Sequence, residues 1–298
     1  MVAKEVKKDS QGISLSSDMK MEKIMSVLVS ILTFLDGRME TPTNYGIWHI
    51  CFLLLTIGAT VLMTVLFRNA SDRTMRRVLT VMWVIFLVFE VYKHIVFSFS
   101  VEDGRIVFDY PWYIFPFQFC STPFYALPFL IFLKDGPVRD FFMMFTTGFV
   151  LFAGLAVMLY PNDVYTTRTG VNIQTMVHHG MQVVMGVMLV AYNRRRMTLR
   201  NLGGGIAVFA LFAATAMTLN ELAYIFFTAN GLDDTFNMFF ISRHFPCTLP
   251  ILSTVYELVP YPVFLLIYLL GFALVSALLF GIEKGILALV MRKKHDTK

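Results

Sequence analysis

Seven apolar stretches, each long enough to cross a lipid bilayer, limit the fold of this chain more than any other feature. A helix needs roughly 20 apolar residues to span the hydrocarbon core. Only 15% of the residues are charged, whereas soluble proteins average about 25%. We therefore predict an all-α, polytopic membrane helical bundle of about seven transmembrane helices. The predicted spans are 45–67, 78–100, 112–133, 138–160, 171–192, 203–228 and 261–282.

The charges between the spans alternate along the chain. Short loops rich in Lys and Arg mark the cytoplasmic side of a membrane. The basic loops follow the first, third and fifth spans and contain Arg68, Arg73, Arg76, Arg77, Lys134, Arg139, Arg194, Arg195, Arg196 and Arg200. The intervening connections are mainly acidic and contain Glu102, Asp103, Asp109, Asp163, Asp233, Asp234 and Glu257. This pattern predicts an outside N-terminus and a cytoplasmic C-terminus, in the plasma membrane of a bacterium by default.

The net charge of +5 is explained by these loops, which lie beside anionic lipid headgroups, so no nucleic-acid partner is needed. Three segments are expected. Residues 45–291 form the membrane domain and residues 292–298 a basic cytoplasmic tail. Residues 1–44 form a polar segment whose apolar run, 24–35, is too short to span. We expect that run to be an interfacial or re-entrant helix, with an eighth crossing as the alternative.

Polar side chains inside the spans are concentrated toward one side of the membrane. Such residues are costly in hydrocarbon and usually face one another or a cavity. The predicted topology puts those of five helices in the outer half, which indicates a shared polar pocket. They are His49, Glu90, Lys93, His94, Gln118, Cys120, His178, His179, Gln182, Asn220 and Glu221.

Spacing along individual helices supports this pocket. Glu90 shares a helix face with Lys93 and His94, because residues three and four apart are neighbours. A structural alternative is that Glu90 and Lys93 simply neutralise each other. Asn220 likewise has a structural alternative, as a hydrogen-bonding anchor between helices.

The third span is interrupted by Pro116, Pro123 and Pro128. Proline removes a hydrogen bond of the helix, and the freed carbonyls need polar neighbours or water. Cys120 lies between two of these prolines. A cysteine in a membrane helix is ordinarily a small packing residue. With histidines at similar depth, however, its thiol could be activated as a nucleophile.

Several short motifs resemble those of the YwaF-like integral membrane proteins. They are Pro116-Phe-Gln-Phe-Cys-Ser, His178-His179-Gly180, Asn220, Asn237-Met-Phe-Phe and Val259-Pro-Tyr-Pro, and the resemblance extends over residues 45–282. That family includes a eukaryotic cysteine-dependent membrane acyltransferase that acts on ether phospholipids. It is also distantly similar to membrane hydrolases of fatty-acid esters of hydroxy fatty acids.

By this resemblance Cys120 matches the acyltransferase nucleophile, His179 the family histidine that precedes a small residue, and His49 a polar position in the first span. Two positions depart from the pattern. Gln118 and Gln174 stand where many members have histidine. The resemblance therefore leaves open whether the base arrangement is complete.

Together these features predict a membrane-embedded acyl-transfer enzyme, an acyltransferase or a lipid ester hydrolase, that acts on lipid or lipoprotein acyl chains. Cys120 would form a thioester, with His179 or His178 as base and then acid. Gln118, Gln182 or Asn220 would stabilise the oxyanion. Glu90 would orient a histidine or pair with Lys93, and His94 and His49 would support the pocket.

Two other functions use the same residues. A lipid-binding or transport protein would need the pocket but no nucleophile. A metal-dependent hydrolase would use the histidines, but the chain lacks a paired ligand spacing such as His-x-x-x-His. We therefore expect no metal and no other cofactor, with membrane lipids as the partners. A retinal protein is excluded because 261–282 contains no lysine.

Overall fold

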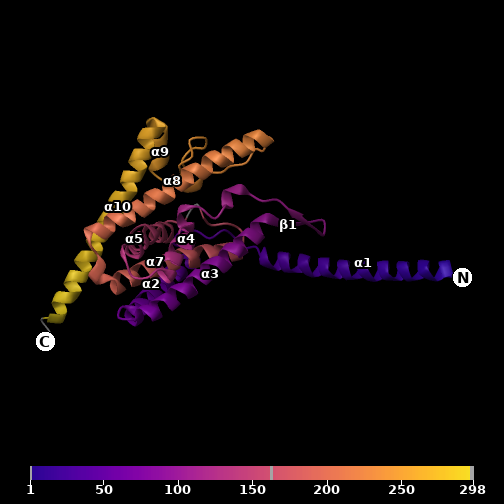
Figure 1. Ribbon diagram of the computed structural model, residues 1–298, viewed down its shortest axis with the longest axis horizontal. Helices are drawn as coiled ribbons and strands as arrows, with labels where there is room; N and C mark the ends of the chain where they lie inside the picture. The colour runs from indigo at the N-terminus through magenta and orange to yellow at the C-terminus, as the bar shows by residue number, and fades with distance from the viewer. Residues whose placement is uncertain (1, 162–163, 296–298) are drawn as a thin grey trace.

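The computed structural model describes the backbone of residues 2–161 and 164–295, and the side chains of residues 19–161 and 164–289. Nearly all of the regular structure is helical, as predicted. The exception in the described ranges is one antiparallel hairpin, β1 (Phe99–Glu102) and β2 (Arg105–Phe108), in which Phe99 pairs with Phe108. The chain is thus an all-α bundle (Figure 1).

Six helices in the described part of the chain are long and apolar enough to cross a membrane. Five are α2 (Ile47–Phe67), α3 (Asp72–Ser98), α7 (Thr169–Tyr192), α8 (Leu199–Asn230) and α10 (Tyr261–His295). The sixth is continuous through α5 (Pro137–Phe145), the π-helical turn η3 (Thr146–Val150) and α6 (Leu151–Leu159). These helices correspond to six of the seven predicted spans.

The third predicted span, 112–133, is not one long helix, and the prediction was wrong in this respect. It consists of two 3-10 turns, η1 (Trp112–Ile114) and η2 (Phe119–Ser121), followed by the ten-residue helix α4 (Pro123–Phe132). Pro116 and Pro123 cannot donate the backbone hydrogen bonds that a continuous helix requires. The chain therefore approaches α4 in extended and 3-10 conformations.

This broken segment nevertheless runs from one end of the bundle to the other. Trp112 packs against Phe227, near the C-terminal end of α8, at a ring distance of 5.4 Å. At the other end, the carbonyl of Ile131 accepts a hydrogen bond from Arg76, near the N-terminus of α3. In the part of the chain that the structure describes, the six membrane-length helices and this broken segment therefore make seven passages through the bundle.

Polar side chains replace the helix bonds that the prolines remove. Pro128 has no N–H for the carbonyl of Phe124, and the indole of Trp83 donates to that carbonyl instead, at 3.0 Å. Pro123 has no N–H for the carbonyl of Phe119, and the hydroxyl of Thr122 donates to that carbonyl, at 2.8 Å. The segment is thus stabilised by its neighbours, as buried irregular backbone in a membrane must be.

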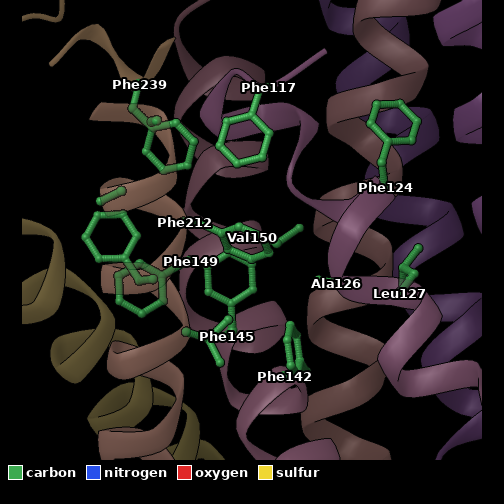
Figure 2. Close-up of a cluster of buried hydrophobic side chains, with 14 of the residues drawn as sticks. Phe117, Phe124, Ala126, Leu127, Phe142, Phe145, Phe149, Val150, Phe212 and Phe239 are labelled. Carbon is green, nitrogen blue, oxygen red and sulfur yellow. The ribbon is translucent and has the colours of Figure 1, made fainter. Parts of the chain in front are cut away.

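Helix α7 lies at the centre of the bundle and packs closely against α2 and α6. Glycines allow the close approach, because a Cβ on Gly154 of α6 would lie 2.8 Å from the carbonyl oxygen of His179 and the Cβ of Gln182. Beside α7, aromatic rings fill the core. Figure 2 shows the side chains of Phe117, Phe145, Phe149, Phe212 and Phe239 gathered in one cluster.

The basic loops after α2, α4 and α7 meet at one end of the bundle, which we call the basic end. Arg139 is buried there and contacts Asp72 and Asp135, while Arg196 contacts Asp135 and Asp140 at 3.0 Å. The loops that the sequence places on one side of the membrane are therefore neighbours in space. That this side is cytoplasmic stays a prediction, and Asp163 of the opposite side lies outside the described residues.

Helix α1 (Val2–Leu35) projects from the bundle as a separate rod (Figure 1). Its last third contains the apolar run 24–35, and its end is attached to the bundle by the hydroxyl of Tyr92, which donates to the carbonyl of Leu35. At the other terminus, α10 continues to His295. Residues 296–298 of the predicted basic tail lie outside the described residues, and the division into three segments stays a prediction.

Candidate active site

The backbone carbonyl of Cys120 is the meeting point of two side chains from α7. His178 Nε2 lies 2.9 Å from this oxygen and Gln182 Nε2 lies 2.6 Å from it. Both are donors, one turn apart on α7. The 3-10 turn η2 leaves this carbonyl free of a helix bond, so the proline break and the α7 side chains together place Cys120 against α7.

These contacts determine where the protons of the neutral histidines lie. A carbonyl only accepts, so His178 carries its proton on Nε2, and its Nδ1 has a free lone pair. His179 Nδ1 lies 2.8 Å from the carbonyl of Thr175 and carries the proton, which leaves the lone pair on Nε2. The two rings lie 5.1 Å apart.

Three polar atoms of this group are buried and have no hydrogen-bond partner within the described ranges: His178 Nδ1, His179 Nε2 and Gln182 Oε1. All three are acceptors, and all three side chains are more than 90% buried. Because unsatisfied buried polar groups are costly and rare, this cluster needs an explanation. A donor such as a thiol, a hydroxyl or a water molecule would satisfy it.

A charged group on α3 lies beside the cluster. Glu90 Oε1 is 2.6 Å from Lys93 Nζ and 3.2 Å from His94 Nε2, and Glu90 is buried. Phe86, one turn before Glu90 on α3, packs on the ring of His178 at 4.8 Å. The His94 ring stacks on Tyr110 with a centroid distance of 5.6 Å. The predicted face of α3 is therefore formed, and it borders the cysteine and histidines.

His49 takes part in a different contact. Its Nδ1 accepts from the backbone N–H of Tyr45, and its Nε2 donates to the carbonyl of Met158, both at 2.8 Å. Both ring nitrogens are thus engaged, and His49 links α2 to the end of α6. Within the described residues, the hydrogen bonds and ring contacts of His49 are with Tyr45, Met158 and Tyr165, so its supporting role in the pocket stays a prediction.

Gln118 and Asn220 bind a buried loop that precedes α9 (Leu252–Leu258). The Asn220 amide donates to the carbonyl of Met238 at 3.1 Å and accepts from its N–H at 2.7 Å. Gln118 accepts from the N–H of Phe239 and donates to the carbonyl of Asn237. The two amides therefore act as backbone partners for this loop.

The depth of this loop was not foreseen from the sequence, which suggested an outer loop. Its 3-10 turn, η5 (Met238–Phe240), contains fully buried side chains, and the hydroxyl of Tyr268 donates to the carbonyl of Phe239 at 2.9 Å. Phe239 also packs against Phe119, beside Cys120, at a ring distance of 5.5 Å. The largely apolar stretch 236–241 was the feature of the sequence that could have indicated a buried loop.

An apolar groove of about 430 Å³ lies between α2, α3 and α7. Its lining includes Ile85 of α3 and Met181 of α7. Met181 precedes Gln182 in α7, and Ile85 precedes Phe86, whose ring lies 4.8 Å from that of His178, while Arg77, near the N-terminus of α3, lines the other part of the groove. The groove has the apolar lining expected of a site for an acyl chain.

No group of three or more His, Cys, Asp or Glu side chains in the described part of the chain is placed to hold a metal ion. The absence of a metal stays a prediction.

Comparison with known proteins adds the family. Residues 43–282, most of the chain, match the model of the TMEM164 family. The chain belongs to the TMEM164 family. For this TMEM164 family member, no curated protein and no solved structure matches. The matched residues include every candidate site residue and nearly coincide with the range of the YwaF-like resemblance. The expectation of a membrane protein family is confirmed, while the YwaF-like name stays a prediction.

Replacing Gly154 by alanine is expected to disturb the site through packing. The added methyl would lie 2.8 Å from the carbonyl oxygen of His179, so α6 and α7 must separate. Overpacking of this kind costs about 1–3 kcal/mol of unfolding free energy. Thermal unfolding in a mild detergent measures it. Gly58→Ala in α2 is the matched control, because nothing lies within 4 Å of a Cβ added there. Equal stability of Gly154→Ala and Gly58→Ala would contradict the prediction.

Proposed function

We propose that this TMEM164 family member is a membrane-embedded acyl-transfer enzyme that uses Cys120 to take an acyl chain from a lipid ester. The observation that carries the proposal is that His178 bonds the Cys120 backbone while His178 Nδ1 and the neighbouring His179 Nε2 are buried acceptors without a partner in the described ranges. A thiol requires a base to become a strong nucleophile, and these nitrogens are the unoccupied acceptors of the cluster. The YwaF-like motif, in which Cys120 and His179 match, supports the same assignment.

In the proposed reaction, Cys120 Sγ attacks the ester carbonyl carbon and its proton passes to a histidine nitrogen, His179 Nε2 or His178 Nδ1. The C–O bond of the ester then breaks, and the histidine returns the proton to the departing alcohol. This leaves a thioester on Cys120. A hydroxyl of a second molecule, or water, attacks the thioester and gives its proton to the histidine, which passes it to the sulfur.

The second amide hydrogen of Gln182 is the favoured oxyanion donor. Gln182 already donates to the Cys120 carbonyl, whereas Gln118 and Asn220 bind the loop around η5. Glu90, which pairs with Lys93 and His94, would contribute to the electrostatic potential at His178 and His179. The groove beside Met181 would hold the acyl chain. We also propose that the acyl chain comes from or goes to a lipid or lipoprotein. The reaction would take place in the outer leaflet of a bacterial plasma membrane.

The proposal is tested by mass spectrometry of the purified protein after incubation with phospholipid. A fatty-acyl mass on the peptide containing Cys120, released by hydroxylamine, is expected. Cys51 is the internal control, since it is an exposed thiol that faces the outside of the bundle. Acylation of Cys51 and Cys120 to the same extent would indicate nonspecific chemistry. Lipid bound in the protein with no adduct and no turnover would favour a lipid-binding or transport role.

A further inference from the structure

A second cavity, of about 370 Å³, opens at the basic end of the bundle. It is formed by the loop after α2, the start of α5 and the 3-10 turn η4 (Arg194–Arg196), which follows α7. Its volume lies in the range of small-molecule sites. Asn193 lines the cavity and follows His179 by 14 residues, about 21 Å along a helix, so the cavity is separate from the candidate active site.

Part of the positive charge around this cavity is neutralised. Arg76 and Arg139 pair with Asp72, and Arg139 and Arg196 pair with Asp135. Arg196 also pairs with Asp140. Three arginines thus face three aspartates. Hydrogen bonds from Arg196 hold the pKa of the Asp135 carboxyl below its usual value, so the one carboxylate that lines the cavity is ionised and already bound.

Three other arginines of the lining keep their full charge. Arg68, Arg194 and Arg195 have no acidic partner among the side chains that the structure describes. Arg194 donates to the carbonyl of Arg68 and to Asn69 Oδ1, which orients its guanidinium without neutralising it. The cavity therefore has a net positive charge and available arginine donors.

A buried donor at the same cavity points to a ligand independently. Asn193 is only 7% exposed, and its Nδ2 has no hydrogen-bond partner in the described ranges. A buried N–H without an acceptor is costly. An oxyanion in the cavity would accept from it, and arginine side chains match the geometry of phosphate oxygens.

We propose that this cavity binds a phosphate group, held by Arg68, Arg195 and Asn193. The phosphate belongs either to the headgroup of an anionic phospholipid or to a soluble phosphorylated molecule. Both supply several acceptor oxygens and negative charge. The proposal does not depend on acyl transfer at Cys120, because none of these residues contacts that site.

The test uses full-length protein in phosphatidylcholine nanodiscs, with thermal unfolding as the readout and ionic strength held constant. One arm adds inorganic phosphate. The other replaces a tenth of the lipid by phosphatidic acid. We expect stabilisation of the wild type in at least one arm. Two variants should weaken the apparent affinity for the phosphate, read from the shift in unfolding temperature, about tenfold or more. They are the double variant Arg68→Gln with Arg195→Gln and the single variant Asn193→Ala, each of which removes charge-assisted or buried hydrogen bonds.

The matched control is Arg73→Gln with Arg200→Gln, which removes the same charge from the same end of the bundle but outside the cavity. Its response should stay close to that of the wild type. Stabilisation by phosphate alone would identify a soluble ligand, and stabilisation by phosphatidic acid alone would identify a lipid headgroup. No stabilisation in either arm, or an equal loss in the control pair, would overturn the proposal.

Discussion

Replacing Cys120 by alanine is expected to abolish acyl transfer by the purified protein, with a loss of roughly 10³-fold or more, since the covalent route is removed. Folding should be little affected. The contacts that His178 and Gln182 make are with the backbone carbonyl of residue 120, which alanine retains. Turnover of a phospholipid with a labelled acyl chain, followed by lipid extraction, measures the effect. Cys51→Ala should leave turnover unchanged.

The same assay distinguishes the roles of His178 and His179. The residue that accepts the thiol proton should lose about 10²–10⁴-fold in turnover when replaced by alanine. His178→Ala also removes a hydrogen bond to the Cys120 carbonyl, so its thermal stability must be measured beside its activity. His179→Ala removes a bond to the Thr175 carbonyl of its own helix. Unchanged turnover in Cys120→Ala would eliminate the thioester mechanism whatever the histidine variants show.

The sequence predicted the long helices well because each one needs only an apolar run of sufficient length. The third span shows the limit of that rule. Its three prolines indicated a distorted helix, but the position of the Cys120 carbonyl depends on the path taken after Pro116. That path is determined in part by partners in other helices, such as His178 and Gln182 for the Cys120 carbonyl and Trp83 for the Phe124 carbonyl. Hydropathy contains no information on these contacts.

For the candidate site, the sequence allowed a prediction of how far along its helix each residue lies, but not of which neighbouring helix its side chain contacts. Depth follows from counting residues along a helix, and it grouped His49 with His178 and His179. Contacts depend on which neighbour a helix face meets, and the His49 ring bonds to Met158 of α6. The face of Glu90, Lys93 and His94 was predictable because all three lie on one helix.

The buried loop around η5 provides the largest expected effect on stability. Asn220 is 1% exposed and satisfies both the N–H and the carbonyl of Met238. In Asn220→Ala, the buried N–H of Met238 loses its partner, and the carbonyl of Met238 keeps only the longer bond from the N–H of Ile241, at 3.4 Å. Leaving a buried polar group unsatisfied costs about 1–3 kcal/mol, so the variant should lose about 2–4 kcal/mol of unfolding free energy. Equilibrium unfolding in mixed micelles measures the difference.

Asn230→Ala is the matched control for this prediction. Asn230 lies on the same helix, is exposed, and donates only to the carbonyl of Phe226 in its own helix. Its loss should stay within about 0.5 kcal/mol, as for most surface substitutions. Because Phe239 of the same loop packs on Phe119 beside Cys120, Asn220→Ala should also lower acyl transfer. A stable Asn220→Ala variant would mean that the loop is held mainly by Gln118, by Tyr268 and by Tyr261, whose hydroxyl donates to the carbonyl of Ile241 at 2.8 Å. The same measurement on Gln118→Ala would then show the larger loss.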